Sequence, residues 1–227
     1  MRINKKLEEL EETEPPQEVK SETDNQVVII NNMPSADEKN QLRAVSLYGN
    51  LTEQKASDVV SGLLYLESTS VIETLGDPED PESTIVEVAQ PIKFYISTYG
   101  GNALDMFSIY DAMNMIKKNT CEIETVALGK VMSAGVPLLA AGTKGRRKIG
   151  ANCRVMLHGV SGGNYGAIYT LENELQEIKW IQDRYIACLV EHTNLTKKKL
   201  KQILRKKTDV YISAKDAIKY GIADEIV

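Results

Sequence analysis

Residues 92–118, IKFYISTYGGNALDMFSIYDAMNMIKK, decide the fold class of this chain. The run Ile92–Ile96 is rich in β-branched and aromatic residues, which predicts a buried strand. Gly100-Gly101 then predicts a turn, and Ala103–Lys118 predicts a helix, because its apolar residues recur at three- and four-residue steps. These apolar residues are Met106, Ile109, Tyr110, Met113 and Ile116. A strand that leads directly into an amphipathic helix is the building unit of layered α/β folds.

The same alternation of strands and helices continues along the rest of the chain. Apolar runs predict further strands, and three- and four-residue apolar spacing predicts further helices. The predicted strands cover residues 44–47, 124–128 and 154–157, and the predicted helices cover 51–67, 134–141, 167–192, 197–206 and 214–220. Short links between these elements predict an α/β fold with a mainly parallel sheet. Such folds place their chemistry at the carboxyl ends of the strands, so functional residues are expected there.

Charge divides the 227-residue chain into an acidic arm and a neutral body. Residues 1–40 hold 10 Asp and Glu against 5 Lys and Arg, whereas residues 41–227 hold 22 of each kind. The arm is expected to be mobile, because it cannot bury enough apolar surface to offset the entropy of ordering. Within the body, the polar and acidic residues 68–90 are expected to form an exposed loop. The neutral body argues against nucleic-acid binding, which normally requires a basic surface.

The sequence also bears on the compartment and on prosthetic groups. The longest apolar stretch, residues 126–142, is interrupted by Lys130 and is too short to span a membrane. No apolar signal segment follows Met1. The three cysteines are too far apart for a metal site or a disulfide framework. We therefore expect a cytoplasmic protein that uses neither a metal nor a cofactor.

Two histidines and one serine are candidates for catalytic roles. His158 directly follows a predicted strand, at the sheet edge where a general base is useful. His192 ends the long predicted helix and is more economically interpreted as a helix-end charge or cap. Ser133 lies at a strand-to-helix junction, where backbone amides and the positive helix end favour a developing negative charge. It is a candidate nucleophile, although an ordinary N-cap serine has the same pattern.

Two further features could complete such a site. The paired glycines Gly100-Gly101 allow backbone N–H groups to approach a substrate carbonyl without interference from a Cβ atom. The alternative is a simple tight turn. The third member of a triad would be an acid, and the residues alone leave several, of which Asp209, just before Val210–Ile212, is one.

Several collinear blocks of the sequence resemble the proteolytic subunit of Clp protease. They are RAVSLYGN from Arg43, FYISTYGG from Phe94, SIYDAM from Ser108, MSAG from Met132, LLAAGTKGRR from Leu138, RVMLH from Arg154 and YISAKDAIKYGIAD from Tyr211. The resemblance extends in order from about Arg43 to Val227. It implies the ClpP/crotonase-type fold, a spiral of ββα units with a protruding strand-helix handle.

The resemblance also implies a role for individual residues. Ser133 matches the family's nucleophile, His158 its base and Asp209 its orienting acid. The backbone amides of Gly100 and Ala134 match its oxyanion hole. The residues expected to form a strand that pairs with the substrate backbone are Gly159, Val160, Ser161, Gly162 and Gly163, with the helix from Ala167 as the rest of the handle.

On this basis the sequence predicts a serine endopeptidase that cleaves unfolded polypeptides inside a homo-oligomer of stacked rings. The family receives its substrates from a hexameric ATP-driven unfoldase, which is therefore an expected partner. The acidic arm, residues 1–40, is expected to act as a gate, a removable propeptide or an unfoldase contact. The remaining domain, residues 41–227, is expected to carry the peptidase.

Departures from the family pattern leave other functions open. Tyr99 replaces the usual proline before the paired glycines, Gly159-Val160 replaces Gln-Pro after the base, and Thr208 replaces an arginine used in ring pairing. The segment 68–90 is longer than the usual link. The alternatives are a catalytically impaired structural ring subunit, a viral capsid-maturation protease of the same superfamily and acyl-CoA chemistry on a crotonase-like fold.

Overall fold

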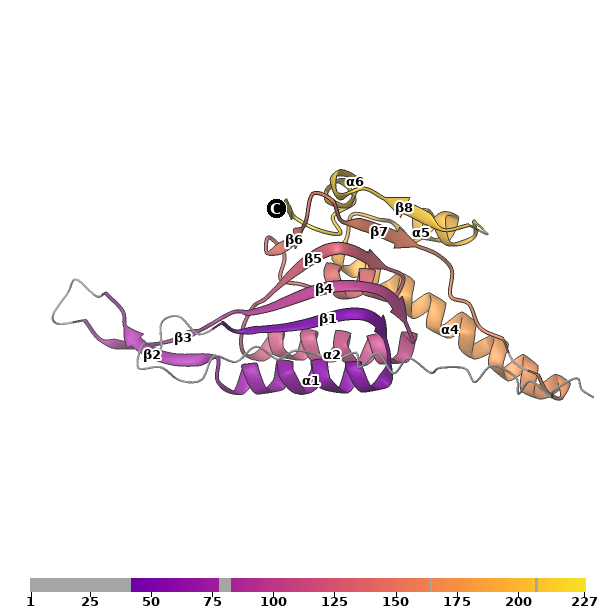
Figure 1. Cartoon of the computed structure of the whole chain (residues 1–227). Helices are drawn as coiled ribbons and strands as arrows, with labels where there is room; N and C mark the ends of the chain where they lie inside the picture. The colour runs from indigo at the N-terminus through magenta and orange to yellow at the C-terminus, as the bar shows by residue number, and fades with distance from the viewer. Residues whose placement is uncertain (1–41, 78–82, 164, 207) are drawn as a thin grey trace, which may run out of the picture.

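The computed structural model describes residues 42–77, 83–163, 165–206 and 208–227 (Figure 1). The strands are β1 (Ala44–Leu51), β2 (Val71–Leu75), β3 (Ile85–Ala89), β4 (Ile92–Gly101), β5 (Ile123–Met132), β6 (Arg147–Ile149), β7 (Arg154–Leu157), β8 (Val210–Ile212) and β9 (Glu225–Ile226). The helices are α1 (Glu53–Ser68), α2 (Ala103–Asn119), α3 (Gly135–Ala140), α4 (Ile168–His192), α5 (Lys197–Leu204) and α6 (Ala214–Lys219). The predicted acidic arm, residues 1–40, lies outside the described residues.

The central sheet is mainly parallel, which confirms the predicted α/β class. Its strand order is β1-β4-β5-β6-β9, and β7 pairs with β5 while β8 pairs with β7. Only the β7–β8 pair among these is antiparallel. The long strand β5 serves two neighbours: Thr125–Ala127 pair with β6, and Lys130–Met132 pair with β7. Gly129, with a φ of 67°, separates the two halves and lets the strand change direction.

Helices cover the sheet and enclose one hydrophobic core. Figure 1 shows α1 and α2 side by side along one face of β1, β4 and β5. Each begins with a side-chain cap: Thr52 accepts from the Lys55 amide, and Asn102 accepts from the amides of Leu104 and Asp105. The apolar residues of α2 that were expected to face the protein core are buried. The packing of α2 against the core therefore follows from the apolar spacing seen in the sequence.

The helix α4 leaves the body at one end. Its buried residues, Tyr185, Ile186, Cys188 and Leu189, all belong to its C-terminal half. The N-terminal half projects away from the sheet (Figure 1), with large apolar side chains exposed. A projecting helix is what the resemblance implied for the handle. Among the described residues, no helix combines the length and apolarity needed to cross a membrane.

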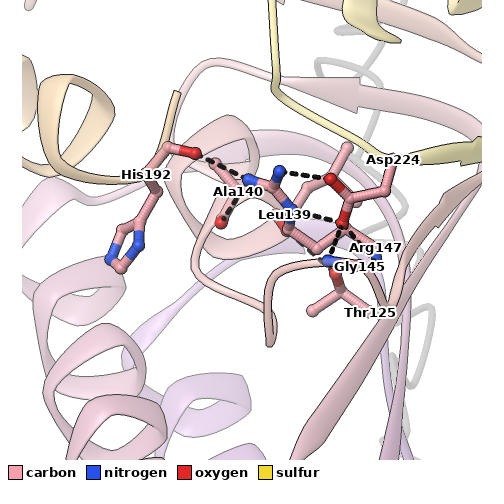
Figure 2. A network of polar contacts seen from close by, with 7 residues as sticks. All are labelled: Thr125, Leu139, Ala140, Gly145, Arg147, His192 and Asp224. Carbon is pink, nitrogen blue, oxygen red and sulfur yellow. Dashed lines mark hydrogen bonds and ion pairs between the residues drawn. The ribbon is translucent and has the colours of Figure 1, made fainter. Parts of the chain in front are cut away.

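A buried arginine ties the ends of two helices to the sheet (Figure 2). Arg147 in β6 is 3% exposed, and its Nε lies 2.8 Å from Asp224 Oδ2. Its Nη1 donates to the carbonyl oxygens of Ala140 (3.1 Å) and His192 (2.6 Å), at the C-terminal ends of α3 and α4. Helix C-termini leave carbonyl groups without internal partners, and the guanidinium satisfies one at each helix. The network therefore fixes the C-terminal ends of α3 and α4 to the sheet.

The prediction of a loop over residues 68–90 is wrong for its two flanks. Residues Val71–Leu75 and Ile85–Ala89 form an antiparallel hairpin that extends from the body (Figure 1). The β-branched residues in these two runs favour extended backbone, and this tendency outweighs the acidic composition. The segment is exposed as expected, with Ile85 at 67%. Residues 78–82 lie outside the described part of the chain.

Candidate active site

Ser133 lies between the end of β5 and the start of α3. Its φ is 51°, and no other non-glycine residue in the described ranges has a positive φ. The backbone is held there by three hydrogen bonds. The Ser133 amide donates to Met156 O (2.8 Å), and Ser133 O accepts from the Val136 amide (3.0 Å) and from the Tyr185 hydroxyl (3.1 Å). Left-handed backbone costs a serine free energy, so its persistence at one residue is typical of a functional site.

His158 follows β7 directly and faces Ser133. The parallel pairing of Met132 with Met156 places the ends of β5 and β7 side by side. His158 Nε2 then lies 2.7 Å from Ser133 Oγ. This is the distance at which a histidine can accept the serine proton. The structure thus brings together the two side chains that the sequence singled out for nucleophile and base.

Asp209 lies opposite His158 but is not bonded to it. The antiparallel pairing of β7 with β8 joins Leu157 to Val210, so the next positions on the two strands are His158 and Asp209. Residues directly opposite one another in a sheet have side chains on the same face. Asp209 is nevertheless exposed, and no hydrogen bond or ion pair joins it to His158 within the part of the chain that the structure describes.

Gly100 packs closely against the Ser133 turn. A Cβ atom built on Gly100 would lie 2.7 Å from Ser133 Cβ and 3.0 Å from the Ala134 amide nitrogen, so only glycine fits. Gly100, one of the two residues expected to donate to an oxyanion, therefore lies beside the serine turn. The Gly100 amide, however, donates to Thr98 Oγ1 (3.0 Å), and the Thr98 hydroxyl donates to Gly49 O (2.5 Å). For Gly100 to bind an oxyanion, its amide must share or leave the bond to Thr98.

Tyr99, at the position of the family's proline, contacts β5. Its ring lies under the Lys130 ammonium, with Nζ 4.4 Å from the ring centroid. Such a cation–π contact is worth about 0.5–1 kcal/mol at an exposed site. It ties the end of β4, just before Gly100, to the neighbouring strand. Tyr99 therefore replaces the rigidity of a proline ring with a contact between side chains.

A cleft of about 660 Å³ opens beside Ser133 and His158. Its apolar wall consists of Leu104, Met156, Ile178 and Ile181 together with Tyr185. A slightly larger cavity of about 700 Å³ lies around Lys117, Arg147 and His192, away from the serine. We assign the chemistry to the smaller cleft, because it alone contains the nucleophile and base candidates.

The predicted substrate strand lies at the rim of this cleft without a strand partner. Gly159, Val160 and Ser161 line the cleft, whereas Gly162 and Gly163 lie beyond it. None of the five belongs to a strand. A strand requires a backbone partner, and the Val160 amide instead donates to Gln182 Oε1 of α4 (3.3 Å). The helix of the expected handle is therefore present, whereas residues 159–163 form no strand in the described part of the chain.

His192 has a structural position, as the sequence suggested. It ends α4, and its Nε2 lies 2.8 Å from the Tyr110 hydroxyl. Burial, followed by the charge of Lys117, lowers the pKa of His192, so the neutral ring is favoured. Of the two roles expected at this helix end, a charge or a cap, the lowered pKa does not favour the charge. The ring acts as a hydrogen-bonding partner between α2 and α4.

Two residues that hold the site escaped the sequence reasoning. Thr98 binds the Gly100 amide, and Tyr185 binds the Ser133 carbonyl from a position 52 residues away. Neither has a local signal, since Thr98 continues a strand and Tyr185 continues the apolar face of a helix.

Comparison with known families gives an independent finding. Residues 84–227 match the family model described as Clp protease.

Proposed function

Because this chain belongs to the Clp protease family and is a serine peptidase of the Clp type, we propose that it cleaves unfolded polypeptides inside a ring-shaped homo-oligomer. Ser133 is the nucleophile, His158 the general base and Asp209 the orienting acid. The observation that carries this proposal is the 2.7 Å contact between Ser133 Oγ and His158 Nε2. It joins a strained serine to one of the two histidines of the chain.

Acylation begins when Ser133 Oγ attacks the carbonyl carbon of a substrate peptide bond. His158 Nε2 accepts the serine proton during the attack and then donates it to the leaving amine. The C–N bond breaks, and an acyl-serine ester remains. A water molecule, deprotonated by the same histidine, then attacks the ester. The histidine donates this proton to Ser133 Oγ as the ester C–O bond breaks, which releases the acid product and restores the serine hydroxyl. The short contact between Oγ and Nε2 supports the first proton transfer, since the imidazole already lies within hydrogen-bond distance of the serine hydroxyl.

The tetrahedral intermediates carry a negative oxygen, which backbone amides can stabilise. We assign this role to the Ala134 amide, next to the nucleophile, and to the amide of Gly100, which packs against the same turn. The close approach of Gly100 to the Ala134 nitrogen supports the pairing. Preorganised donors of this kind contribute about 2.7–4 kcal/mol each to catalysis. The hydrogen bond from Gly100 to Thr98 must open or become shared as the intermediate forms.

Substrate binding is proposed to occur along the segment Gly159–Gly163. An extended substrate would add its backbone to this segment and would displace Gln182 from the Val160 amide. Backbone pairing is independent of side-chain identity, which suits a protease that accepts many unfolded chains. The apolar wall of Leu104, Ile178 and Ile181 favours an apolar side chain next to the cleaved bond.

Assembly into stacked rings is supported by the surface of α4. The projecting half of this helix exposes large apolar side chains that a single chain leaves in water. Their exposed fractions are 71% for Ile168, 79% for Tyr169, 51% for Leu175 and 52% for Trp180. We propose that these residues are buried between subunits, and that a hexameric ATP-driven unfoldase delivers substrates to the assembled ring, as family membership suggests.

Active-site labelling tests the proposal directly. A fluorophosphonate should label the wild-type assembly at Ser133, and a fluorogenic peptide should be hydrolysed. Ser133→Ala should abolish both reactions while native mass spectrometry shows an unchanged assembly. Ser213→Ala serves as a matched control, because Ser213 caps α6 and lies outside the cleft. Peptide hydrolysis that survives Ser133→Ala would disprove the assignment of the nucleophile.

A second candidate function is a structural ring subunit with impaired catalysis. It is favoured by the absence of a bond between Asp209 and His158 among the described residues. This function predicts an assembly that hydrolyses no peptide on its own and gains activity only when mixed with an active subunit. The same mixing experiment, with Ser133→Ala in this chain, shows which subunit supplies the nucleophile.

A further inference from the structure

The hydroxyl of Tyr185 binds the backbone of the proposed nucleophile. Tyr185 lies in the C-terminal half of α4, is 4% exposed, and donates its hydroxyl hydrogen to Ser133 O over 3.1 Å. Burial, reinforced by Cys188, raises the pKa of Tyr185. The phenol therefore remains protonated and remains a hydrogen-bond donor throughout the working pH range of a protein.

The bonded carbonyl belongs to the same peptide unit as an oxyanion donor. The C=O of Ser133 and the N–H of Ala134 are the two polar ends of one planar trans peptide, and they point in opposite directions. A group that fixes the direction of the carbonyl therefore also fixes the direction of the Ala134 N–H. In this structure, the hydroxyl of Tyr185 binds one end of the plane, and Gly100 lies close to the other.

A second donor to the same oxygen does not make the tyrosine redundant. The Val136 amide also donates to Ser133 O (3.0 Å), but it belongs to the same turn and moves with it. Tyr185 instead links the turn to α4, whose C-terminal carbonyl at His192 is bound to Arg147. Because the φ of Ser133 is positive, the turn is strained and needs an external contact to hold one orientation.

One face of α4 contacts both sides of the catalytic pair. Gln182, three residues before Tyr185, accepts from the Val160 amide in the segment that follows His158. Residues three apart lie on the same helix face. Tyr185 thus connects the helix to the turn that carries Ser133, and Gln182 connects it to the segment after His158.

We propose that Tyr185 is a positioning residue of the active site, whose hydroxyl orients the Ser133–Ala134 peptide so that the Ala134 amide faces the oxyanion. This inference rests on the proposed function, in which Ser133 is the nucleophile and the Ala134 amide an oxyanion donor. Tyr185 acts on the transition state through the backbone and leaves the binding of the ground-state substrate unchanged.

The test compares Tyr185→Phe with wild type in the assembled enzyme. The substitution removes one oxygen and keeps the ring, so kcat for a fluorogenic peptide should fall roughly 10- to 100-fold, as expected for a misplaced donor, while KM changes little. A peptide boronate, which forms a tetrahedral adduct with the serine, should bind more weakly by a similar factor. A peptide alcohol of the same sequence, which forms no adduct, should bind as before.

Tyr110→Phe is the matched control. Tyr110 is also a buried tyrosine whose hydroxyl is hydrogen-bonded, in this case to Glu191 and His192, and it lies outside the cleft. Tyr110→Phe should leave kcat unchanged. Installing 4-aminophenylalanine at position 185 restores an N–H donor at the same place and should restore most of kcat.

Several results would overturn the inference. They are an unchanged kcat in Tyr185→Phe, an equal loss in Tyr110→Phe, a parallel rise in KM, or failure of Tyr185→Phe to assemble, which would make the role structural. Failure of the proposed function looks different. In that case the wild-type protein is inactive, or Ser133→Ala retains activity. If wild type is active and Ser133→Ala is inactive, the proposed nucleophile holds, and the result for Tyr185→Phe tests the role of Tyr185 alone.

Discussion

Asp209 and His158 flank the last residue pair of β7 and β8, Leu157 with Val210, yet their side chains are not hydrogen-bonded within the described structure. The register of the two strands thus places the acid at the sheet edge that carries the base. A substrate strand on Gly159–Gly163 would cover this edge from water. Removing water strengthens the attraction between a carboxylate and a protonating imidazole.

Asp209→Asn is therefore expected to lower kcat/KM by roughly 10³–10⁴-fold, because the amide cannot stabilise the imidazolium or hold its tautomer. Peptide hydrolysis across the pH range measures the effect. Asp183→Asn is the control, since Asp183 is an exposed carboxylate that only approaches Lys201, at 3.8 Å. Equal activity of Asp209→Asn and Asp183→Asn would mean that another group orients His158.

The positive φ of Ser133 predicts a difference between two inactive variants. Ser133→Gly should be more stable than Ser133→Ala by about 1 kcal/mol, because glycine adopts left-handed backbone without the steric cost of a Cβ atom. Denaturant unfolding of the two proteins measures this difference in the free energy of unfolding. If the alanine variant is the more stable one, the turn is not strained at this residue.

The pair of Asp224 with Arg147 predicts how stability depends on pH. Burial alone would raise the pKa of Asp224, but the hydrogen bonds and charge of Arg147, with the Gly145 amide, lower it below its usual value. Because the pKa of Asp224 is lower in the folded protein than in the unfolded chain, where it is about 3.9, the ionised carboxylate stabilises the fold at pH values above about 3.9. This stabilisation is lost as the pH falls through the pKa of Asp224 in the folded protein. The free energy of unfolding should therefore decrease below about pH 4.

Asp224→Asn provides the comparison for this pH effect. At pH 7 the variant should be less stable by on the order of 3 kcal/mol, because it leaves a buried guanidinium without its counter-charge. Its stability should then change less with acid than that of wild type. Urea unfolding at pH 7 and pH 3 measures both quantities, and parallel pH curves for the two proteins would contradict the prediction.

Like charges face each other in the exposed hairpin, where Glu73 of β2 is paired with Glu87 of β3. Glu87→Lys replaces this repulsion with an opposite-charge pair worth roughly 0.2–1 kcal/mol. Hydrogen exchange of the hairpin amides should then slow about two- to fivefold. Glu87→Gln removes only the repulsion and should give an intermediate rate, and identical rates in all three proteins would show that the carboxylates do not interact.

The fold was predictable where periodic apolar residues extend over a long element. The helix predicted over Ala103–Lys118 is observed as Ala103–Asn119, because its burial follows directly from side-chain spacing. The strand predicted over Ile92–Ile96 begins where expected but continues to Gly101, through the paired glycines. The short strands β6 and β9 were missed. They contain three residues and two residues, and their pairing depends on neighbours that only the folded chain provides. Such strands carry no periodic signal of their own.

The candidate site was predictable in part for the same reason. Ser133 and His158 each follow a predicted parallel strand, and parallel strands bring their carboxyl ends to one edge. The contacts of Thr98 and Tyr185 could not be predicted, since each depends on a hydrogen bond that joins separate elements. The lack of a bond between Asp209 and His158 in the described structure was equally inaccessible, because strand register sets the position of a residue but not the rotamer of an exposed side chain.

The bond between Arg147 and Asp224 determines when, during translation, this part of the fold can form. The two residues are 77 positions apart, so a nascent chain that ends at α6 has already made the buried guanidinium but not its carboxylate. Such a chain would have to bury an uncompensated charge at the C-terminal ends of α3 and α4, which is strongly unfavourable. Partly synthesised chains should therefore fail to fix these helices and the serine turn. The ion pair delays maturation of the peptidase until translation has passed α6 and reached Asp224.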